Sequence, residues 1–341
     1  MHFCIFGCGK IAQVHAQNLK KLARFVPGHP CQFSFASRHP ARAREYQERL
    51  GGTLAFGSYE EALKCDKIDV VVICAPNDCH HELALRALGA NKHVIIEKPI
   101  TCKTAQADEI LALSATHGKK VFVAENFAYR PSIQGLGRLI DSGELGVVKL
   151  ISINILHGRT FKPDEWRSDV RRMGGGPLID GGIHWVNALL NLGGGEPVKI
   201  SALRPPTTVR NCPQEDTLCV LCQFESGTVG ALNYSWGTLG TFPIKVVAVH
   251  GSLSSAYVAT NGLFGLHMRK LPRPLFFPRK DRGGFEAMWK NFLNCLAGRE
   301  ETCLASGEIG RRDLAFVERV GACLEAPGMA GLPGDVEGIT A

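Results

Sequence analysis

The sequence has no apolar run long enough to cross a membrane. The longest runs, such as Val70 to Ala75, fall far short of the roughly 20 apolar residues that a membrane-spanning helix needs. A secretory signal is also missing, because Met1 leads within a few residues into a strand-like run and a glycine loop. We therefore expect a cytoplasmic protein with no membrane partner.

The sequence also lacks the paired cysteines of disulfide-rich and zinc-binding proteins. It has 13 cysteines, an odd number, and many, such as Cys4 and Cys74, lie in apolar runs. This pattern indicates buried, reduced thiols. The only C-x-x-C, Cys219 to Cys222, lies in a strand-like run, where side chains three apart point to opposite faces. No second pair is near it, so we expect no metal site.

A motif for reading nucleic acid is likewise missing. The formal net charge is +7, but the basic clusters are dispersed and have acidic neighbours. Such clusters are typical of a solvated surface, and no nucleic-acid-binding motif accompanies them. The alternative is an anionic small molecule, such as a phosphorylated cofactor or a nucleotide-linked sugar. The clusters are Arg38–Arg44, Arg167–Arg172 and Arg279–Arg282.

What the sequence does contain is a first part, residues 1–124, in which short apolar strands alternate with helical segments. Repeated β-α-β units predict a parallel sheet with helices on both faces. Thr101 is a candidate N-cap for the last of these helices. The expected strands are 2–6, 32–36, 70–74, 94–96 and 121–124, and the expected helices are 11–22, 59–64, 81–88 and 101–117.

From residue 125 onward the pattern changes to longer strands. Runs of strands after an alternating half predict a second, α+β domain over residues 125–326, with a large, mostly antiparallel open sheet. Residues 327–341 are expected to form a loosely ordered tail. The expected strands are 147–156, 198–203, 217–224, 230–236 and 244–250, and the expected helices are 131–142, 285–296 and 308–324.

A glycine-rich turn joins the first strand to the first helix. Gly7-x-Gly9-x-x-Ala12 has the spacing of a dinucleotide-binding fingerprint, in the strand–turn–helix context that the fingerprint requires. Gly7 permits the tight turn, Gly9 lets the backbone approach a pyrophosphate, and Ala12 lets helix and strand pack closely. The pyrophosphate would bind the free N–H groups of the helix N-terminus. Gly7, Gly9, Lys10 and Ile11 are therefore candidate cofactor contacts.

The end of the second strand distinguishes NAD from NADP. An acidic residue there would bind the adenosine ribose of NAD, but the sequence has Ser37-Arg38-His39. A hydroxyl followed by a guanidinium suits the 2′-phosphate of NADP, because arginine pairs well with phosphate. An arginine can also stack on adenine and accept both cofactors. We expect NAD(P)(H), with NADP(H) favoured, and Ser37 and Arg38 as contacts.

Polar residues also follow two later buried strands. Pro76, Asn77 and His80 come after one strand, and Glu97-Lys98-Pro99 comes after the next. Ligands of open α/β sheets bind beyond the carboxyl ends of the strands. We therefore expect Asn77 and Lys98 to face the nicotinamide end of a cofactor cleft.

A glycine-rich segment, Gly174-Gly175-Gly176, leads to Asp180 and His184. Residues four apart lie on one face of a helix, so this carboxylate and imidazole can bind the same substrate or tune one another. The spacing alone fits a surface pair. The three glycines, together with Lys98 at a strand end elsewhere, favour a site.

Together these segments resemble the glucose–fructose oxidoreductase, inositol dehydrogenase and rhizopine-catabolism family, Gfo/Idh/MocA. The resemblance runs from Gly7 to roughly Leu324 and also includes Trp166-Arg167. It implies an N-terminal Rossmann domain with a doubly wound parallel sheet. It also implies a C-terminal domain whose open sheet often forms the subunit interface, so we expect a homodimer or homotetramer through that sheet.

The resemblance further implies a catalytic set of Lys98, Asp180 and His184. His184 acts as general base or acid, Lys98 donates a hydrogen bond to the same substrate oxygen, and Asp180 orients the substrate hydroxyl or the histidine. The other implied contacts are Pro76, Asn77, His80, Glu97, Lys98 and Arg167 for the cofactor, and Tyr129, Arg130 and Trp166 for the substrate.

The predicted activity is NAD(P)-dependent hydride transfer to or from a secondary alcohol or ketone of a sugar, cyclitol or related ring. Two alternatives use the same fold: a redox-assisted glycosidase and a cofactor-binding ligand sensor. The complete set of Lys98, Asp180 and His184 favours an enzyme, because a sensor has no chemical reason to keep it. Arg167, Arg171 and Arg172 suggest an anionic substrate, and a solvated loop explains them as well.

Overall fold

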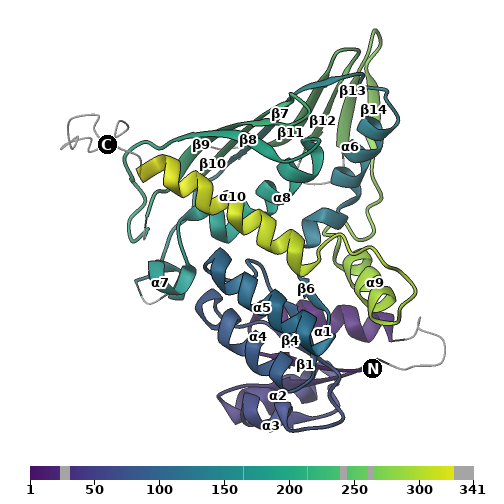
Figure 1. Cartoon of the computed structure of the whole chain (residues 1–341), viewed down its shortest axis with the longest axis vertical. Coiled ribbons are helices and arrows are strands. Elements are labelled where there is room, and N and C mark those ends of the chain that lie inside the picture. Colours follow the sequence, from purple (N-terminus) through teal and green to yellow (C-terminus); the bar gives the residue numbers. More distant parts are fainter. Residues whose placement is uncertain (24–30, 164, 213, 239–243, 260–263, 326–341) are drawn as a thin grey trace.

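The computed structural model describes residues 1–23, 31–163, 165–212, 214–238, 244–259 and 264–325. Within these ranges the chain forms two sheets with helices between them (Figure 1). The predicted combination of a parallel Rossmann sheet and a second, mostly antiparallel sheet is confirmed. The predicted tail, 327–341, lies outside the described residues. No helix in the described ranges has the length and apolar character needed to span a membrane.

The first sheet is parallel, with strand order β3-β2-β1-β4-β5-β6. This is the Rossmann order. Strand β4 is Val-Val-Val-Ile and is fully buried, as expected for a parallel strand with helices on both faces. The strands are β1 His2–Phe6, β2 Gln32–Ala36, β3 Ala55–Phe56, β4 Val70–Ile73, β5 His93–Ile96 and β6 Val121–Val123.

The helices of this part are α1 Lys10–Leu22, α2 Pro40–Leu50, α3 Tyr59–Leu63, α4 His80–Gly89 and α5 Thr104–His117, with the short turn η1 Asn77–Cys79. Helix α2 was not predicted, because its sequence is highly charged and only Ala43, Tyr46 and Leu50 are buried. The N-cap prediction for Thr101 is wrong. Helix α5 begins at Thr104, and the Thr101 hydroxyl donates to the main-chain oxygen of Lys103 at 2.8 Å.

The second sheet has the order β14-β13-β12-β11-β7-β10-β9-β8. Strands β7 and β10 are parallel, and the other neighbours are antiparallel. Strands β12 to β14 were not predicted. The strands are β7 Val148–Leu156, β8 Pro197–Leu203, β9 Thr217–Phe224, β10 Val229–Ser235, β11 Ile244–Gly251, β12 Ser255–Ala259, β13 Phe264–Met268 and β14 Arg273–Phe276.

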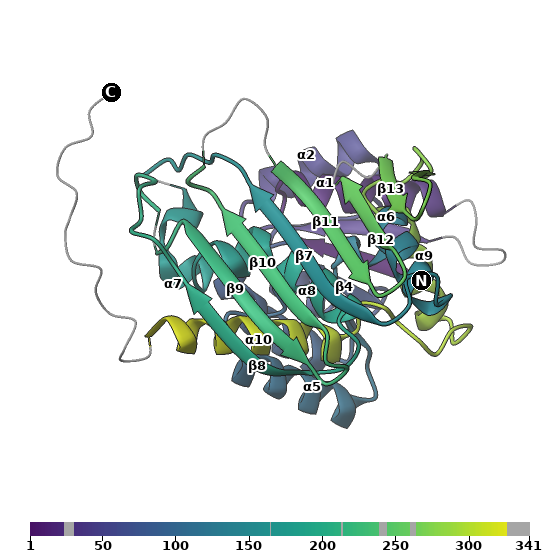
Figure 2. The same ribbon diagram turned by 90° about the horizontal axis from the view of Figure 1, so that it is seen from above.

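Helices cover one face of the second sheet and leave the other uncovered among the described residues (Figure 2). The alternation along β9 illustrates the two faces: Cys222 is buried and Cys219 is exposed, as predicted for side chains three apart in a strand. The remaining helices are α6 Pro131–Asp141, α7 Val170–Met173, α8 Ile183–Leu192, α9 Phe285–Leu296 and α10 Gly307–Glu325, with the turns η2 Asn126–Tyr129, η3 Trp166–Ser168 and η4 Leu178–Gly182.

Helices α9 and α10, the last two described helices, pack back against the Rossmann part of the chain. Trp289 of α9 is fully buried and meets Phe3 of β1 edge-on, with ring centroids 5.6 Å apart. Helix α10 packs against both α5 and α8. The two sheets are thereby held together, and the carboxyl ends of the parallel strands face the loops before α8.

Candidate active site

The glycine loop has the geometry that a dinucleotide pyrophosphate requires. Gly7 has φ +103°, and a Cβ there would lie 2.5 Å from the main-chain oxygen of Cys74, so only glycine fits. Gly9 is the N-cap of α1 and supplies no side-chain cap. The first N–H groups of α1 are thus left for a ligand. The observed turn therefore fits the cofactor that the sequence predicts.

A cleft of about 590 Å³ opens beside this loop. It lies beyond the carboxyl ends of the parallel strands, where α/β folds bind nucleotides, and residues from the second part of the chain close it. It is lined by Gly7, Cys8, Gly9, Lys10, Ile11, Ser37, Arg38, Arg42, Tyr59, Cys74, Ala75, Pro76, Asn77, Glu97, Lys98, Trp166, Arg167 and Asp180. Most of the predicted cofactor contacts are therefore brought together in one cleft.

The end of the cleft next to β2 is basic. Arg38 lines it, and the Ser37 hydroxyl accepts a hydrogen bond from the main-chain N–H of His39 at 3.1 Å. Arg42, which the sequence did not single out, also lines the cleft and donates to the main-chain oxygen of Cys8 at 3.0 Å. Among the described residues that line the cleft, the only acidic ones are Glu97 and Asp180. Glu97 follows β5 and Asp180 lies in η4, so neither is at the end of β2. Arg38 thus stands just after β2, where an NAD-specific site would carry a carboxylate, and Arg42 of α2 adds a second guanidinium to this end of the cleft.

Lys98 joins the two parts of the chain at the other end of the cleft. Its Nζ donates to the main-chain oxygen of Asp180 at 2.7 Å and lies 3.7 Å from Asp180 Oδ1. The ammonium group is therefore held at the carboxyl end of β5, where a substrate oxygen can meet it.

Asp180 is an anchor for three cations. The Asp180 side chain is 6% exposed, and its carboxylate accepts from Arg159 Nη1 at 2.9 Å and from Arg167 Nε at 3.2 Å. Burial alone would raise the pKa of Asp180, but the charges of Lys98, Arg167 and Arg159 outweigh burial and hold that pKa well below its ordinary value. Asp180 is consequently ionised and cannot serve as a proton carrier near neutral pH.

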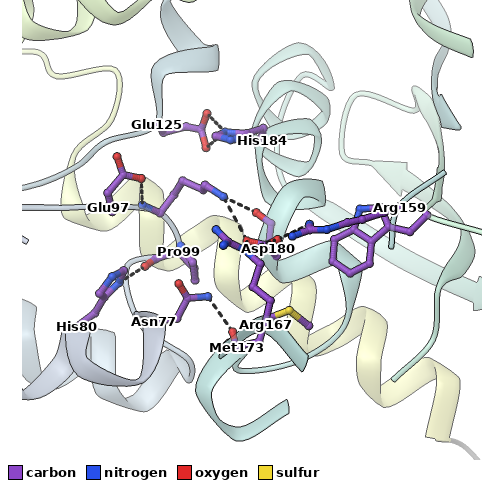
Figure 3. Close-up of polar contacts among 12 residues, drawn as sticks. Asn77, His80, Glu97, Pro99, Glu125, Arg159, Arg167, Met173, Asp180 and His184 are labelled. Carbon is purple, nitrogen blue, oxygen red and sulfur yellow. Dashed lines mark hydrogen bonds and ion pairs between the residues drawn. The ribbon is translucent and has the colours of Figure 1, made fainter. Parts of the chain in front are cut away.

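His184 has a different partner from the one that its spacing suggested. Asp180 lies in the π-helical turn η4 and His184 in α8, and Figure 3 shows their side chains in separate contacts. His184 Nδ1 lies 2.7 and 2.9 Å from the two carboxylate oxygens of Glu125. Asp180 and His184 thus have separate partners among the described residues, and of the two alternatives that the spacing left open, binding of one substrate by both stays a prediction.

An aromatic ring fixes the plane of the imidazole. Phe127 stacks on His184, with centroids 4.0 Å apart and an interplanar angle of 11°. The Arg130 guanidinium lies 3.6 Å from the centre of the Phe127 ring. Because both groups stack on one ring, Phe127 lies between the predicted catalytic histidine and Arg130, a predicted substrate contact.

Glu97 belongs to a buried chain of hydrogen bonds behind the cleft. Its Oε1 lies 2.7 Å from His15 Nε2, and Trp289 Nε1 donates to His15 Nδ1 at 3.1 Å. Burial alone would raise the pKa of Glu97, but the hydrogen bond from His15, the charge of Lys98 and, when it is protonated, the charge of His184 outweigh burial, so the net shift is downward. Lys98 and His184 therefore both lie close to one ionised carboxylate.

Two of the predicted contacts that do not line the cleft are turned into the protein interior. His80 is fully buried, and its ring nitrogens lie 2.8 and 3.0 Å from the main-chain oxygens of Pro99 and Ala75. Tyr129 is buried against α9 and donates to Asn291 at 2.6 Å. This placement argues against His80 as a cofactor contact and against Tyr129 as a substrate contact, because both side chains are already committed to the protein interior.

Three residues of the site were missed. Glu125 directly follows the predicted strand 121–124, so the same strand-end argument that found Lys98 applies to it. Arg42 is one turn into the unpredicted helix α2. Arg159 follows β7, and its guanidinium lies 4.5 Å from the centre of the Trp236 ring. No motif marks Arg159, because its partners come from distant parts of the sequence.

Comparison with known proteins gives consistent matches for both parts of the chain. Residues 1–125 match the family described as "Oxidoreductase family, NAD-binding Rossmann fold", and residues 133–255 match the "GFO/IDH/MocA C-terminal domain". The chain is 31% identical over 228 residues to D-xylose 1-dehydrogenase (NADP(+)) 2 of Haloferax volcanii, which covers 65% of this chain and 67% of that protein.

Two further matches extend this picture. Myo-inositol 2-dehydrogenase of Thermotoga maritima is 24% identical over 238 residues, covering 69% of this chain and 68% of that protein. The aldose-aldose oxidoreductase from Caulobacter crescentus, solved in complex with glycerol, has the same fold, with a TM-score of 0.82 at 22% identity over 95% of this chain and 97% of that chain.

Proposed function

The chain belongs to the Gfo/Idh/MocA family of oxidoreductases, and from this we propose that it transfers a hydride between NADP(H) and a secondary alcohol or ketone of a sugar, cyclitol or related ring. The observation that carries the proposal is that Lys98 and Glu97 line the inner end of the cofactor cleft, and that His184, beside it, is near enough to Glu97 to affect its pKa. An ammonium donor and an imidazole at one place are what an alcohol oxygen needs when its proton leaves.

When bound, the nicotinamide supplies the acceptor or donor of the hydride. The side chains handle the oxygen and its proton. His184 takes the hydroxyl proton during oxidation and returns it during reduction. Lys98 donates a hydrogen bond to the same oxygen and stabilises its negative charge. Asp180 keeps Lys98, Arg159 and Arg167 in place through its ionised carboxylate.

The preference for NADP(H) rests on the basic end of the cleft. Arg38 and Arg42 both line it, and arginine pairs well with a phosphate. The printed name of the Haloferax volcanii relative includes NADP(+), which supports the same choice. Titration of the protein with NADPH and NADH side by side tests it, and equal affinity for the two would overturn it.

A neutral polyol suits the site better than an anionic substrate. The three arginines that suggested an anion each have an acidic partner: Arg167 pairs with Asp180, Arg171 with Asp169 and Arg172 with Asp78. The names of the D-xylose and myo-inositol relatives agree with a neutral ring bearing hydroxyls.

A panel of substrates tests the activity. Cofactor fluorescence is followed with inositols, aldoses, keto-sugars, nucleotide-sugars, aminocyclitols and cyclic dihydrodiols. We expect turnover with at least one neutral ring compound and loss of that turnover in Lys98→Ala. Cofactor binding without turnover across the whole panel would contradict the proposed enzyme and favour a sensor.

The uncovered face of the second sheet supports a homo-oligomer. It presents apolar side chains to solvent, including Leu221, 55% exposed, and Val198, 54% exposed. An apolar sheet face of this kind is typical of a surface that a protein partner covers. We propose that a second copy of the chain covers it, and sedimentation velocity would then give a multiple of the 37.0 kDa chain mass.

A further inference from the structure

The contact between Glu125 and His184 joins two segments that are 59 residues apart in the sequence. Glu125 follows β6 and is 3% exposed, and His184 lies in the first turn of α8. Both carboxylate oxygens face Nδ1, at 2.7 and 2.9 Å. The imidazole is thus engaged at one nitrogen by an acceptor that water barely reaches.

The hydrogen-bonding pattern determines which nitrogen of His184 carries the proton. Glu125 Oε1 also accepts from the main-chain N–H of Phe127 at 3.0 Å, so this carboxylate acts as an acceptor on both sides. A neutral imidazole has one N–H and one lone pair. With its N–H at Nδ1, directed at Glu125, the lone pair of His184 is at Nε2, on the other side of the ring.

One short segment fixes the imidazole in two ways. Glu125 holds an edge of the ring, and Phe127, two residues later, stacks on its face at 4.0 Å. Glu125 is also the N-cap of the turn η2 that contains Phe127. The position of the carboxylate and that of the stacking ring are therefore linked through the main chain.

Other elements bring further charges to this pair. Glu97 and Lys98 approach from the end of β5, Arg130 from the segment before α6, and Asp313 from α10. Burial raises the pKa of Asp313 to about 7, and the charge of Glu125 adds to that rise. Glu97, Lys98 and Arg130 are the fixed charges around the pair, and Asp313 is a second titrating group that a change at Glu125 can shift.

We propose that Glu125 is a positioning residue for His184, a role that rests on the proposed hydride transfer. It keeps the proton on Nδ1, which leaves Nε2 to exchange a proton with the substrate, and it stabilises the imidazolium that forms. During oxidation the substrate O–H bond breaks and its proton goes to Nε2. A bound NADP⁺ would accept the carbon-bound hydrogen with its electron pair, so that a C=O bond replaces the broken C–H and O–H bonds.

The direct test is the tautomer of His184. Long-range ¹H–¹⁵N correlation spectra of histidine-labelled protein distinguish a protonated Nδ1 from a protonated Nε2, and a spectrum of His184→Ala assigns the signal among the 12 histidines. In the wild type we expect Nδ1–H and an unprotonated Nε2 for the neutral ring. Nε2–H in the wild type would overturn the proposal, and this measurement needs neither substrate nor a variant of Glu125.

The kinetic test uses Glu125→Gln, which keeps the shape and removes the charge. We expect kcat to fall by about tenfold to a thousandfold, the range for losing the partner of a working imidazole, with KM little changed. The midpoint of the acidic limb of the kcat/KM profile moves to lower pH, because the imidazolium loses its neighbouring negative charge. Glu125→Asp restores part of kcat.

The matched control is Glu109→Gln. Glu109 also accepts from a histidine, with His81 Nε2 2.9 Å from its Oε2, but this pair is on the surface between α4 and α5. Its kcat and pH profile should match the wild type. If Glu125→Gln lowers stability but leaves the pH profile unchanged, Glu125 is only structural and the proposal fails. If no substrate turns over in the wild type, the proposed function fails, while the tautomer still decides the role of Glu125.

Discussion

Lys98, at the carboxyl end of β5, donates a hydrogen bond to the main-chain oxygen of Asp180, 2.7 Å away in the π-helical turn η4. The acceptor is a main-chain atom, so the position of Lys98 depends on the path of the chain around Asp180 as well as on its carboxylate. The Asp180 carboxylate also accepts hydrogen bonds from Arg159 and Arg167. One buried aspartate thus joins the cofactor cleft to the second sheet.

Removal of the ammonium group tests the role of Lys98. We expect Lys98→Ala to lower kcat by about 10²–10³-fold, the usual cost of losing one donor to a developing oxyanion. NADPH affinity and the melting temperature should change much less, because Asp180 keeps its two arginine partners. The control is Lys64→Ala, on the exposed end of α3. A kcat within a few-fold of the wild type would remove Lys98 from the mechanism.

Removal of the imidazole tests the proton carrier. General acid–base catalysis contributes about 10²–10⁴-fold, so His184→Ala should lose that much turnover and keep its cofactor affinity. Steady-state rates at saturating cofactor measure the loss. A loss of tenfold or less would mean that another group moves the proton.

The affinities for NADPH and NADH test the role of Arg38 at the basic end of the cleft. A hydrogen bond to a charged group is worth about 1.5–3 kcal/mol, so Arg38→Ala should weaken NADPH binding by about tenfold to a hundredfold and leave NADH binding nearly unchanged. Calorimetric titration with each cofactor measures both. Arg44→Ala is the control, because Arg44 is an exposed residue of α2 outside the cleft. Equal weakening of NADPH and NADH would place Arg38 on adenine instead of the phosphate.

The parallel sheet and one end of the site could be predicted because their signals are local. A β-branched run such as Val70–Ile73 indicates a strand buried on both faces, and the strand-end rule then places Lys98 at the cleft. The partner of His184 could not be found in this way. A spacing of four suggested Asp180, but Asp180 lies in a π-helical turn, and the acceptor is Glu125, from a distant strand end.

The same limit applies to Arg159 and His15. Arg159 follows β7 and has no motif around it, and its function depends on Asp180 and the ring of Trp236. His15 is one of several polar residues of α1, and only the return of α9 to the first sheet brings Trp289 to it. Contacts of this kind depend on how the two sheets pack, and a periodicity in one segment does not contain that information.

The buried hydrogen bonds that run from Trp289 through His15 to Glu97 should contribute measurably to the free energy of unfolding. Trp289→Phe keeps an aromatic ring but removes the donor to His15 Nδ1, and an unpaired buried acceptor costs about 1–3 kcal/mol. Urea unfolding gives this value. Because the two residues share one hydrogen bond, Trp289→Phe and His15→Phe should be non-additive in a double-mutant cycle. Additive effects would show that packing alone accounts for the loss.

The ionised state of Asp180 predicts how stability depends on pH. Burial alone would raise its pKa, but Lys98, Arg167 and Arg159 lower it well below the ordinary value of about 3.9 that the unfolded chain retains. A lowered pKa contributes stability above about pH 4, and this contribution is lost as the pH falls.

Asp180→Asn therefore lowers the free energy of unfolding most at neutral pH. Breaking a buried ion pair costs up to about 3–5 kcal/mol, and the cost here is smaller because the side chains of Lys98, Arg159 and Arg167 are 17%, 26% and 32% exposed. Urea unfolding from neutral pH to about pH 3 should show the gap between wild type and variant narrowing below about pH 4. The control Asp108→Asn breaks only a surface pair with Arg311 and should stay close to the wild type throughout. A gap that stays constant with pH would mean that the Asp180 charge does not stabilise the fold, and that the three cations are held by packing and by the Asp180 main-chain oxygen instead.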